Sequence, residues 1–218
     1  RDRVLAEGAD LGVAFDGDFD RCFFFGSGGE FVSGETMVGL LTQFFSKRGS
    51  NETIVHDPRL VFNTKKVCKD SGSTSIQSKT GHLFMKQTMR RFQAVYGGEI
   101  SAHHYFKDFF YCDSGMIPWL IVCEIIGKTG ISIDELSEAR KIEFPSSEEI
   151  NFKVNSSNVV MQLIEEKYKD SCIEIEKDDG ISMLFEGWRF NLRSSNTEPL
   201  LRLNVETATS EEALKEKV

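Results

Sequence analysis

The hydrophobic and polar positions change their spacing from one segment of the chain to the next. In some segments apolar residues recur every three or four positions, as on one face of a helix, and in others they form short runs typical of buried strands. This pattern predicts helices over residues 36–49, 61–72 and 83–91, alternating with strands over 52–57, 73–78 and 92–98. Alternating helices and strands indicate a layered α/β domain with a mixed sheet.

The pattern changes after a proline and a polar cluster at residues 142–149, which we interpret as a linker. A strand over 150–154 leads into an amphipathic helix, and four more strands follow. We expect these strands at 172–176, 181–186, 188–192 and 200–207. The residues expected on the buried face of the helix are Val160, Leu163, Ile164 and Tyr168. The second half therefore reads as a small α+β C-terminal domain.

Composition and charge narrow the classes of partner. The 218 residues carry a net charge of -8 and a pI near 5.1, which argues against nucleic acid or an anionic membrane as a partner. The longest apolar stretch, residues 116–126, is too short to span a bilayer and contains Glu124, so we expect a core helix there. The five cysteines form no CxxC pair, which favours buried thiols in a reducing compartment, and we expect a cytoplasmic protein.

The stretch "AFDGDFDR" places Asp16, Asp18 and Asp20 at alternate positions directly after an apolar run. In an extended segment these side chains share a face and repel one another unless a cation lies between them. An EF-hand is excluded, because Arg21 replaces the glycine and Ser27 the glutamate of a calcium loop. We predict a carboxylate cluster that holds Mg²⁺ beside a phosphoryl group, with Arg21 adding positive charge. The alternative is a solvated acidic turn.

The stretch "SKTGH" places Lys79 and His82 on either side of a glycine turn that leads from a strand into a helix. Ligands of α/β domains bind at such an edge of the sheet. Lys79 could donate to a phosphate or hydroxyl, and His82 could donate or exchange a proton. The alternative is a surface lysine and a histidine that only begins a helix.

In "GGEISAHHYF" we expect an extended segment in which Glu99, Ser101 and His103 share one face and His104 points the other way. A carboxylate, a hydroxyl and an imidazole on one face suit the vicinal hydroxyls of a sugar, and the preceding glycine pair lets a ligand approach the backbone. The alternative is a buried polar network that serves only the fold.

The stretch "RSSNTEP" lies in a turn between two predicted strands. A guanidinium combined with hydroxyl, amide and backbone donors makes a good phosphate cradle. Its candidate ligands are Arg193, Ser195, Asn196 and Thr197. These residue types are also ordinary turn formers, which is the alternative.

In this order and spacing the four motifs resemble those of the α-D-phosphohexomutases, most closely the bacterial phosphomannomutase branch; "HDPRL" and "YCDSGMIPWL" also fit. Members have four domains around a cleft, and their loops carry, in order, a phosphorylated serine, Mg²⁺, the sugar-reading residues and the phosphate-binding residues. The resemblance implies that residues 1–30 end domain two with its metal loop, that 31–145 form the sugar-binding domain three, and that 146–218 form an incomplete domain four. No phosphoserine loop is present, so the missing N-terminal domains of the same protein are an expected partner.

The resemblance also implies residue roles. Asp16, Asp18 and Asp20 would hold Mg²⁺, and Glu99 and Ser101 would bind hydroxyls of the hexose. The residues implied near the reacting groups are Arg21, Lys79, His82 and His103. Those implied to bind the phosphate that is not transferred are Arg193, Ser195, Asn196 and Thr197.

The implied reaction interconverts mannose 6-phosphate and mannose 1-phosphate through a phosphoserine enzyme and a hexose 1,6-bisphosphate, and the fragment alone is expected to be inactive. Phosphoglucomutase activity is an alternative, because mannose and glucose differ at one ring carbon. A non-catalytic phosphosugar-binding fragment is another. A phosphatase with Asp16 as nucleophile is also open, although it leaves "GGEISAHHYF" and "RSSNTEP" unexplained.

Overall fold

A computed structural model describes residues 1–49, 51–195 and 200–218. These residues form two compact units, each with its own core. The first comprises Arg1–Asp57 and Asn63–Lys141, and the second Pro58–Phe62 and Ile142–Val218. The mixed α/β architecture followed by a small α+β part confirms the predicted fold class. The domain limits 1–30, 31–145 and 146–218 remain predictions.

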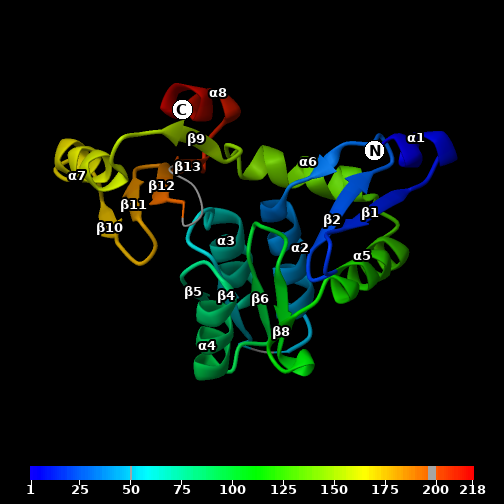
Figure 1. Cartoon of the computed structure of the whole chain (residues 1–218). Coiled ribbons are helices and arrows are strands. Elements are labelled where there is room, and N and C mark those ends of the chain that lie inside the picture. The colour runs from blue at the N-terminus through cyan, green and yellow to red at the C-terminus, as the bar shows by residue number, and fades with distance from the viewer. Residues whose placement is uncertain (50, 196–199) are drawn as a thin grey trace. The chain divides into compact units, whose positions relative to one another are not determined.

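The first unit begins with helix α1 (Asp2–Glu7) and a small antiparallel sheet in the order β1-β2-β3 (Figure 1, blue). Its strands are β1 (Leu11–Phe15), β2 (Cys22–Gly26) and β3 (Phe31–Val32). Cys22 and Phe24 on β2 are buried and pack with Met37 and Val122. The residues that join β1 to β2, 16–21, form the turn of a hairpin, which we call the aspartate loop.

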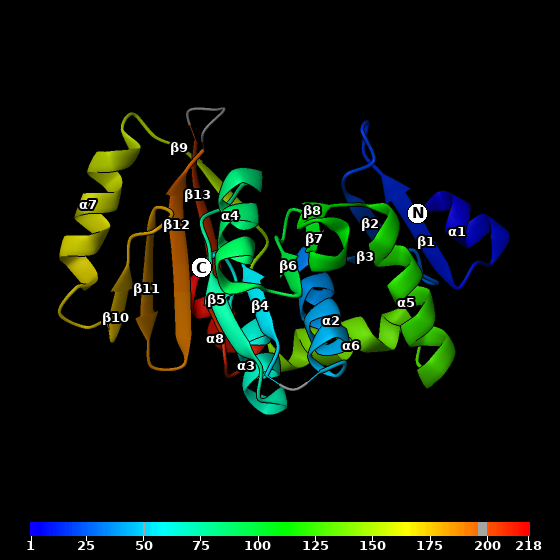
Figure 2. The same ribbon diagram turned by 90° about the horizontal axis from the view of Figure 1, so that it is seen from below.

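The second sheet of this unit has the order β5-β4-β6-β7-β8, with three parallel strands followed by two antiparallel ones (Figure 2). Its strands are β4 (Thr53–His56), β5 (Thr74–Gln77), β6 (Tyr96–Gly98), β7 (His104–Phe106) and β8 (Cys112–Asp113). The helices are α2 (Gly34–Ser46), α3 (Phe62–Ser71), α4 (His82–Phe92), the single 3-10 turn η1 (Lys107–Phe109), α5 (Met116–Thr129) and α6 (Ile133–Glu143). The helices and strands predicted between residues 36 and 98 are therefore confirmed, with ends that differ by a few residues.

Neighbouring residues on β4 point to opposite faces of this sheet. Ile54 packs with Leu41 and Cys68, from α2 and α3. Val55 packs with Met85 and Met89 of α4. Because strand side chains alternate in direction, α2 and α3 cover one face and α4 covers the other.

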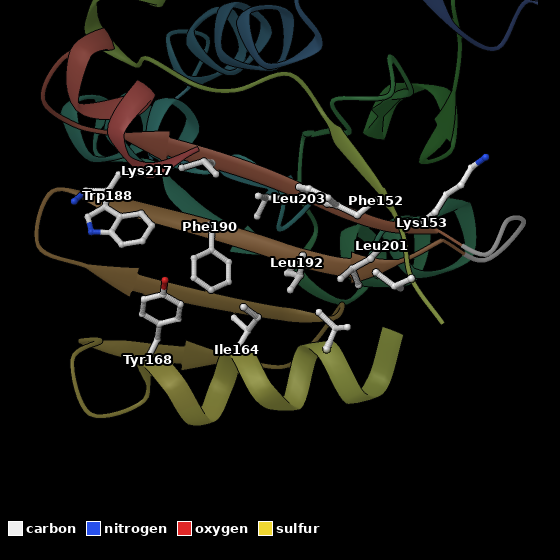
Figure 3. Close-up of a pocket in the computed structure, with 13 residues that line it drawn as sticks. Phe152, Lys153, Ile164, Tyr168, Trp188, Phe190, Leu192, Leu201, Leu203 and Lys217 are labelled. Carbon is white, nitrogen blue, oxygen red and sulfur yellow. The ribbon is translucent and has the colours of Figure 1, made fainter. Parts of the chain in front are cut away.

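The second unit contains an antiparallel five-stranded sheet in the order β10-β11-β12-β13-β9. Its strands are β9 (Ile150–Lys153), β10 (Glu174–Glu176), β11 (Ile181–Phe185), β12 (Trp188–Ser194) and β13 (Leu200–Thr207), and its helices are α7 (Ser157–Tyr168) and α8 (Glu211–Lys217). The strands and the amphipathic helix predicted here are confirmed. An apolar cavity of about 350 Å³ lies between α7 and the sheet, with Tyr168 and Phe190 in its lining (Figure 3).

One residue predicted on the buried face of α7 is exposed. Val160, Ile164 and Tyr168 pack against the core, but the Leu163 side chain is 59% exposed and Met161 packs in its place. At 100° per residue, Met161 lies on the same side of the helix as Ile164 and Tyr168, whereas Leu163 lies beyond the edge of that stripe. The prediction for Leu163 was wrong.

The predicted linker at residues 142–149 is more structured than expected. Helix α6 continues to Glu143, and Phe144 is buried. The Ser147 N–H donates to the Val205 carbonyl at 2.8 Å, and Thr207 N–H donates to the Pro145 carbonyl at 2.9 Å. Backbone pairing with β13 therefore orders a segment that its proline and serines suggested was an open connection.

A buried ion pair ties Pro58–Phe62 to the strands of the second unit. Arg189 and Glu206 face each other across β12 and β13, and their side chains are 3.2 Å apart. Glu206 also accepts hydrogen bonds from the Val61 and Phe62 N–H groups, and Arg189 donates to the Pro58 carbonyl at 2.7 Å. This pair was not predicted, because nothing local to either strand identifies its partners.

The cysteines only partly follow the prediction of buried thiols. Cys22 and Cys68 are buried, and burial raises the pKa of each thiol to about 12. Cys123 is exposed, and Cys112 and Cys172 are half-buried, so for these residues the prediction was wrong. Cys123 lies on a turn of α5 whose apolar neighbours, rather than Cys123 itself, face the core.

Residues 116–126 form part of α5, as predicted. Within the described ranges no single helix has both the length and the hydropathy needed to cross a membrane. Together α5 and α6 meet those criteria by length and composition, but they are bent by 95° at their junction.

Candidate active site

The aspartate loop gathers its three carboxylates by a turn, not by an extended strand. Phe19 within it has a left-handed φ of 62°, which reverses the chain between β1 and β2. Asp16, Asp18 and Asp20 each place a carboxylate oxygen within 4.8 Å of the others. The predicted convergence of the carboxylates is present, but the predicted reason for it, alternation along a strand, was wrong.

Arg21 supplies positive charge inside this loop. Its Nε donates to one oxygen of Asp16 at 2.6 Å and its backbone N–H to the other at 3.2 Å. Burial alone would raise the pKa of Asp16, but these hydrogen bonds and the guanidinium charge outweigh it and lower the pKa. Asp16 therefore stays ionised.

The negative charge of Asp20 is compensated by fewer contacts than that of Asp16. Its Oδ1 lies 3.8 Å from Arg21 Nε and has no hydrogen-bond partner among the described residues. Its pKa is raised, first by burial and then, against the effect of His103, by the charges of Asp18, Asp16 and Asp113. An oxygen with surplus negative charge around it favours a bound cation.

The stretch "SKTGH" forms the connection from β5 to α4, as predicted. Gly81 precedes the first turn of α4 with φ 112°, a backbone geometry open to glycine, and His82 is the first residue of the helix. The Lys79 side chain is exposed, and its Nζ lies 5.8 Å from the centre of the Phe84 ring. His82 instead turns toward carboxylates, with Nδ1 at 3.1 Å from Asp113.

The predicted extended comb of Glu99, Ser101 and His103 does not form. Residues 99–102 make a tight turn between β6 and β7, which we call the Glu99 turn: Glu99 N–H donates to the His103 carbonyl, and Ala102 is left-handed with φ 72°. The correction follows from backbone pairing, because β6 and β7 form a hairpin in which Gly98 faces His104. His104 does point away from His103: it is fully buried and bonded to the Tyr96 hydroxyl at 2.8 Å, and burial together with the His103 charge lowers its pKa to about 3.

The glycine pair before the turn serves packing. A Cβ at Gly97 would lie 2.6 Å from the Met89 sulfur, and one at Gly98 would lie 2.6 Å from the Tyr96 hydroxyl. The predicted approach of a ligand to this backbone was therefore wrong, because core side chains already fill the space.

Glu99 links two of the predicted motifs. Its side chain is almost fully buried; one oxygen accepts the Gly81 N–H at 2.9 Å, and the other accepts the Tyr105 hydroxyl at 2.6 Å. Burial, then the neighbouring Glu99 charge, raises the pKa of Tyr105. The Glu99 turn is also held by Asp57, which accepts the Ile100 N–H at 2.8 Å. Ser101 lies in this turn.

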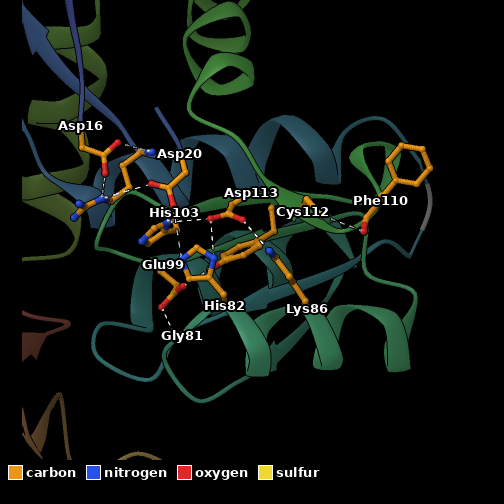
Figure 4. Close-up of polar contacts among 12 residues, drawn as sticks. Asp16, Asp20, Gly81, His82, Lys86, Glu99, His103, Phe110, Cys112 and Asp113 are labelled. Carbon is orange, nitrogen blue, oxygen red and sulfur yellow. Dashed lines mark hydrogen bonds and ion pairs between the residues drawn. The ribbon is translucent and has the colours of Figure 1, made fainter. Parts of the chain in front are cut away.

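Asp113 contacts both His82 and His103 (Figure 4). Its Oδ2 lies 3.1 Å from Nδ1 of His82 and 3.1 Å from Nδ1 of His103, and its Oδ1 lies 3.1 Å from Lys86 Nζ. Burial would raise the pKa of Asp113, but the hydrogen bonds from His103 and Lys86 outweigh it and lower the pKa to about 2. An isolated backbone bridge between Arg21 and His103 brings the aspartate loop to this group.

Asp113, Lys86 and Tyr105 were not predicted as site residues. Asp113 ends a short strand just before the Ser-Gly that leads into α5, so a carboxylate at a strand end was the signal available for it. Lys86 and Tyr105 carry no such signal. Their roles depend on contacts with residues distant in the chain.

The second unit contains the residues for which a phosphate cradle is predicted. Arg193 is the last residue but one of β12, and its side chain is buried. Its Nη2 lies 3.0 Å from Glu149, and Arg202 lies 3.4 Å from the same carboxylate. Ser195 N–H donates to the Leu200 carbonyl at 2.9 Å. Asn196 and Thr197 lie outside the described residues. Glu149 was not predicted, and it now occupies the position of an anion between two arginines.

Two family models match most of this chain. Residues 33–143 match the family model "Phosphoglucomutase/phosphomannomutase, alpha/beta/alpha domain III", and residues 149–218 match "Phosphoglucomutase/phosphomannomutase, C-terminal domain". The chain belongs to the phosphoglucomutase/phosphomannomutase family. The resemblance to phosphohexomutases inferred from the motifs is confirmed, as is the assignment to the C-terminal part of the family's chain.

Relatives within the family are close in sequence. The chain is 52% identical over 211 residues to a phosphomannomutase of Vibrio cholerae, covering 96% of this chain and 46% of the relative. It is 50% identical over 207 residues to a phosphomannomutase of Escherichia coli K12, covering 95% and 45%. It thus spans about half the length of the curated relatives it matches.

Solved structures share the fold. A phosphoglucomutase/phosphomannomutase family protein from Burkholderia thailandensis has a TM-score of 0.81 and 26% identity, covering 99% of this chain and 46% of its own. A protein described as a putative phosphomannomutase from Thermus thermophilus has a TM-score of 0.75 at 17% identity, covering 98% and 46%.

Proposed function

We propose that a protein containing this chain is a phosphomannomutase, to which the chain contributes the metal, sugar and phosphate loops. The observation that carries the proposal is the convergence of Asp16, Asp18 and Asp20 next to His82 and His103. A carboxylate cluster beside two imidazoles matches the needs of phosphoryl transfer, which are a cation on the phosphoryl group and a proton acceptor near the attacking hydroxyl. The names of the relatives support mannose phosphates as substrates.

The donor set of the aspartate loop fits Mg²⁺. Three carboxylates within 4.8 Å of one another offer the oxygen ligands that this ion prefers, and the remaining positions suit water and phosphate oxygens. When bound, Mg²⁺ supplies positive charge to the phosphoryl group. Arg21 keeps Asp16 ionised and adds a guanidinium beside the same group.

The two histidines provide the proton chemistry in this proposal. Asp113 lies against Nδ1 of both His82 and His103, so each ring would hold a proton on that nitrogen and leave Nε2 to face a hydroxyl. An imidazole so held can accept a proton from the attacking sugar oxygen and return it to the leaving one. Lys79 is an additional phosphate donor in the proposal, because its exposed ammonium can move toward a ligand.

In this proposal the Glu99 turn binds the hydroxyl groups of the sugar. Both oxygens of Glu99 already accept one hydrogen bond each, but a carboxylate has about four lone-pair sites, so Glu99 keeps the capacity to accept a further hydrogen bond from a sugar hydroxyl. Ser101 in the same turn adds a hydroxyl. In this role Glu99 also fixes the Gly81 turn, so sugar binding and the placement of His82 depend on one side chain.

The phosphate that is not transferred would bind at Arg193, Ser195, Asn196 and Thr197. The Arg193 Nε has no hydrogen-bond partner among the described residues, and a phosphate that engaged it would replace Glu149 at Nη2. A phosphate dianion is a better partner than a single carboxylate for two neighbouring arginines. The cycle itself would pass through a phosphoserine and a hexose 1,6-bisphosphate, which requires a loop outside this chain.

The test is an assay of a complete protein that contains this chain. We expect mannose 6-phosphate and mannose 1-phosphate to interconvert when Mg²⁺ and catalytic hexose 1,6-bisphosphate are present, as followed by phosphorus NMR. Asp18→Asn should reduce kcat, and this chain alone should be inactive. Interconversion of glucose phosphates with a higher kcat/KM would support the phosphoglucomutase alternative, and binding without turnover by the complete protein would support the non-catalytic one.

A further inference from the structure

A second group of metal-ligating side chains lies beside the aspartate loop, and its chemistry differs. Asp20, His82, His103 and Asp113 each offer one ligand atom, and the four atoms lie within 4.8 Å of one another. We call these four residues the imidazole cluster (Figure 4). It combines two nitrogen and two oxygen ligands, whereas the aspartate loop offers oxygen alone.

The spacing within the imidazole cluster suits a tetrahedral ion. Asp113 Oδ2 lies 3.1 Å from each imidazole Nδ1, and Asp20 Oδ2 lies 3.7 Å from His103 Nδ1 and 3.9 Å from His82 Nε2. With metal–ligand bonds of about 2.0–2.1 Å, the ligands of tetrahedral zinc are roughly 3.3 Å apart. The two carboxylate distances to His103 Nδ1, 3.1 and 3.7 Å, lie on either side of this value. His82 would give the ion one of its two nitrogens, and since one ligand atom from each residue lies within 4.8 Å of the others, rotations of the side chains would complete the site.

The surroundings support this ligand set. Lys86 holds the other oxygen of Asp113 at 3.1 Å, which fixes the carboxylate with Oδ2 toward the imidazoles, as an outer contact fixes a ligand in known metal sites. Asp20 Oδ1 has no hydrogen-bond partner in the described part of the chain. The positive charge of Lys86 opposes a cation, but the two carboxylates of the cluster more than balance it.

We propose that the imidazole cluster binds a transition-metal ion such as Zn²⁺ or Co²⁺, at a site distinct from the Mg²⁺ site proposed for the aspartate loop and sharing Asp20 with it. Mixed imidazole and carboxylate ligands select such ions over Mg²⁺, which prefers six oxygens. Because Asp20 belongs to both groups, the two ions compete for it. A bound transition metal also occupies both imidazoles, so it blocks their use in proton transfer.

The experiment is a Co²⁺ titration of this chain followed by visible absorption, which reports the ligands and coordination number of cobalt. We expect saturable bands of four-coordinate cobalt. His82→Ala and His103→Ala should each weaken the affinity by at least about tenfold, as the loss of a metal contact does elsewhere. The His82 side chain is 44% exposed, so its replacement leaves the fold intact, which circular dichroism checks.

The matched control is Asp18→Asn, since Asp18 is an exposed member of the aspartate loop alone. It should leave the Co²⁺ affinity unchanged, whereas Asp20→Asn should lower it. The proposal is overturned if the chain binds no Co²⁺, if both histidine variants bind it normally, or if Asp18→Asn abolishes binding. A sulfur-to-cobalt charge-transfer band would also overturn it, because it would assign the ion to a cysteine. None of these results depends on mutase activity.

Discussion

The aspartate loop and imidazole cluster of the first unit differ from the arginine pairs of the second in how their charges are balanced. In the first unit carboxylates are in excess, and the pKa of Asp20 is raised. In the second, each of the buried arginines Arg189 and Arg193 has a carboxylate within 3.2 Å. Unbalanced charge marks a place where a ligand can bind, whereas balanced and buried charge holds a structure together.

Arg193 combines features of a structural ion pair and of a ligand-binding site. It forms an ion pair with Glu149, as Arg189 does with Glu206, yet its motif predicts a phosphate ligand. Glu149 makes ion pairs with two arginines, whereas Glu206 also accepts two backbone N–H groups. A carboxylate held only by ion pairs can be displaced by a stronger anion, and one that also satisfies buried backbone donors cannot.

The largest effect is expected at the structural pair. Glu206→Ala should destabilise the second unit by about 3 kcal/mol, because it leaves two N–H groups without their acceptor and leaves the buried Arg189 charge with Glu176, at 3.5 Å, as its carboxylate partner. Urea unfolding followed by Trp188 fluorescence, in a Trp119→Phe background, measures it. Glu211→Ala, which removes an exposed ion pair with Lys215, is the control and should cost far less, because solvent screens that pair. A loss below about 1 kcal/mol at Glu206 would contradict the structural role.

A smaller loss is expected at the Glu99 turn. Glu99→Ala should lower the free energy of unfolding of the first unit by about 2 kcal/mol, because Gly81 N–H and Tyr105 hydroxyl lose a buried acceptor. Amide exchange at Gly81 should accelerate, and Glu99→Gln should do so less because the amide keeps one acceptor oxygen. If Glu99→Ala left Gly81 exchange and stability as they were, the carboxylate would serve the ligand only.

The third prediction tests the phosphate cradle in this chain. Mannose 6-phosphate should bind weakly, with a Kd of roughly 1 mM, because few contacts offset the cost of association. Arg193→Ala should weaken binding at least tenfold, and Asp18→Ala should barely change it. Backbone amide shifts during the titration measure both. If Arg193→Ala left these amide shifts unchanged, the loop would be only a turn and not a phosphate site.

The smallest effect is expected at Glu149, and it tests whether the ion pair of Arg193 can be displaced by a ligand. Glu149→Gln should raise the affinity of the same site for phosphate several-fold, because the ligand no longer has to displace a carboxylate from Arg193 and Arg202. Glu148→Gln, which removes a neighbouring charge, is the control. Weaker binding in Glu149→Gln would show that Glu149 orients Arg193 for the phosphate rather than competing with it.

Local patterns were sufficient for much of the fold. The spacing of apolar residues predicted α2, α3 and α4, because one face of each is covered by the sheet and the sequence must supply that face. The same reasoning failed for Leu163, where the pattern was broad enough to admit one residue too many. The spacing of apolar residues therefore predicts that a helix exists more reliably than it predicts which residues lie at the edge of its buried face.

The sequence by itself determined which chemical groups this protein brings to its sites: the three aspartates, the histidines and the arginine motif are legible as short motifs. Only the tertiary structure decided how they are used. Asp113 reaches His82 across 31 positions of sequence, and Glu206 reaches Val61 across 145. Such contacts arise because the sheet brings strand ends together and because buried charges must find partners wherever the chain places them. A sequence motif shows which residues it contains, but the packing of the whole chain determines which charged residues lie next to them.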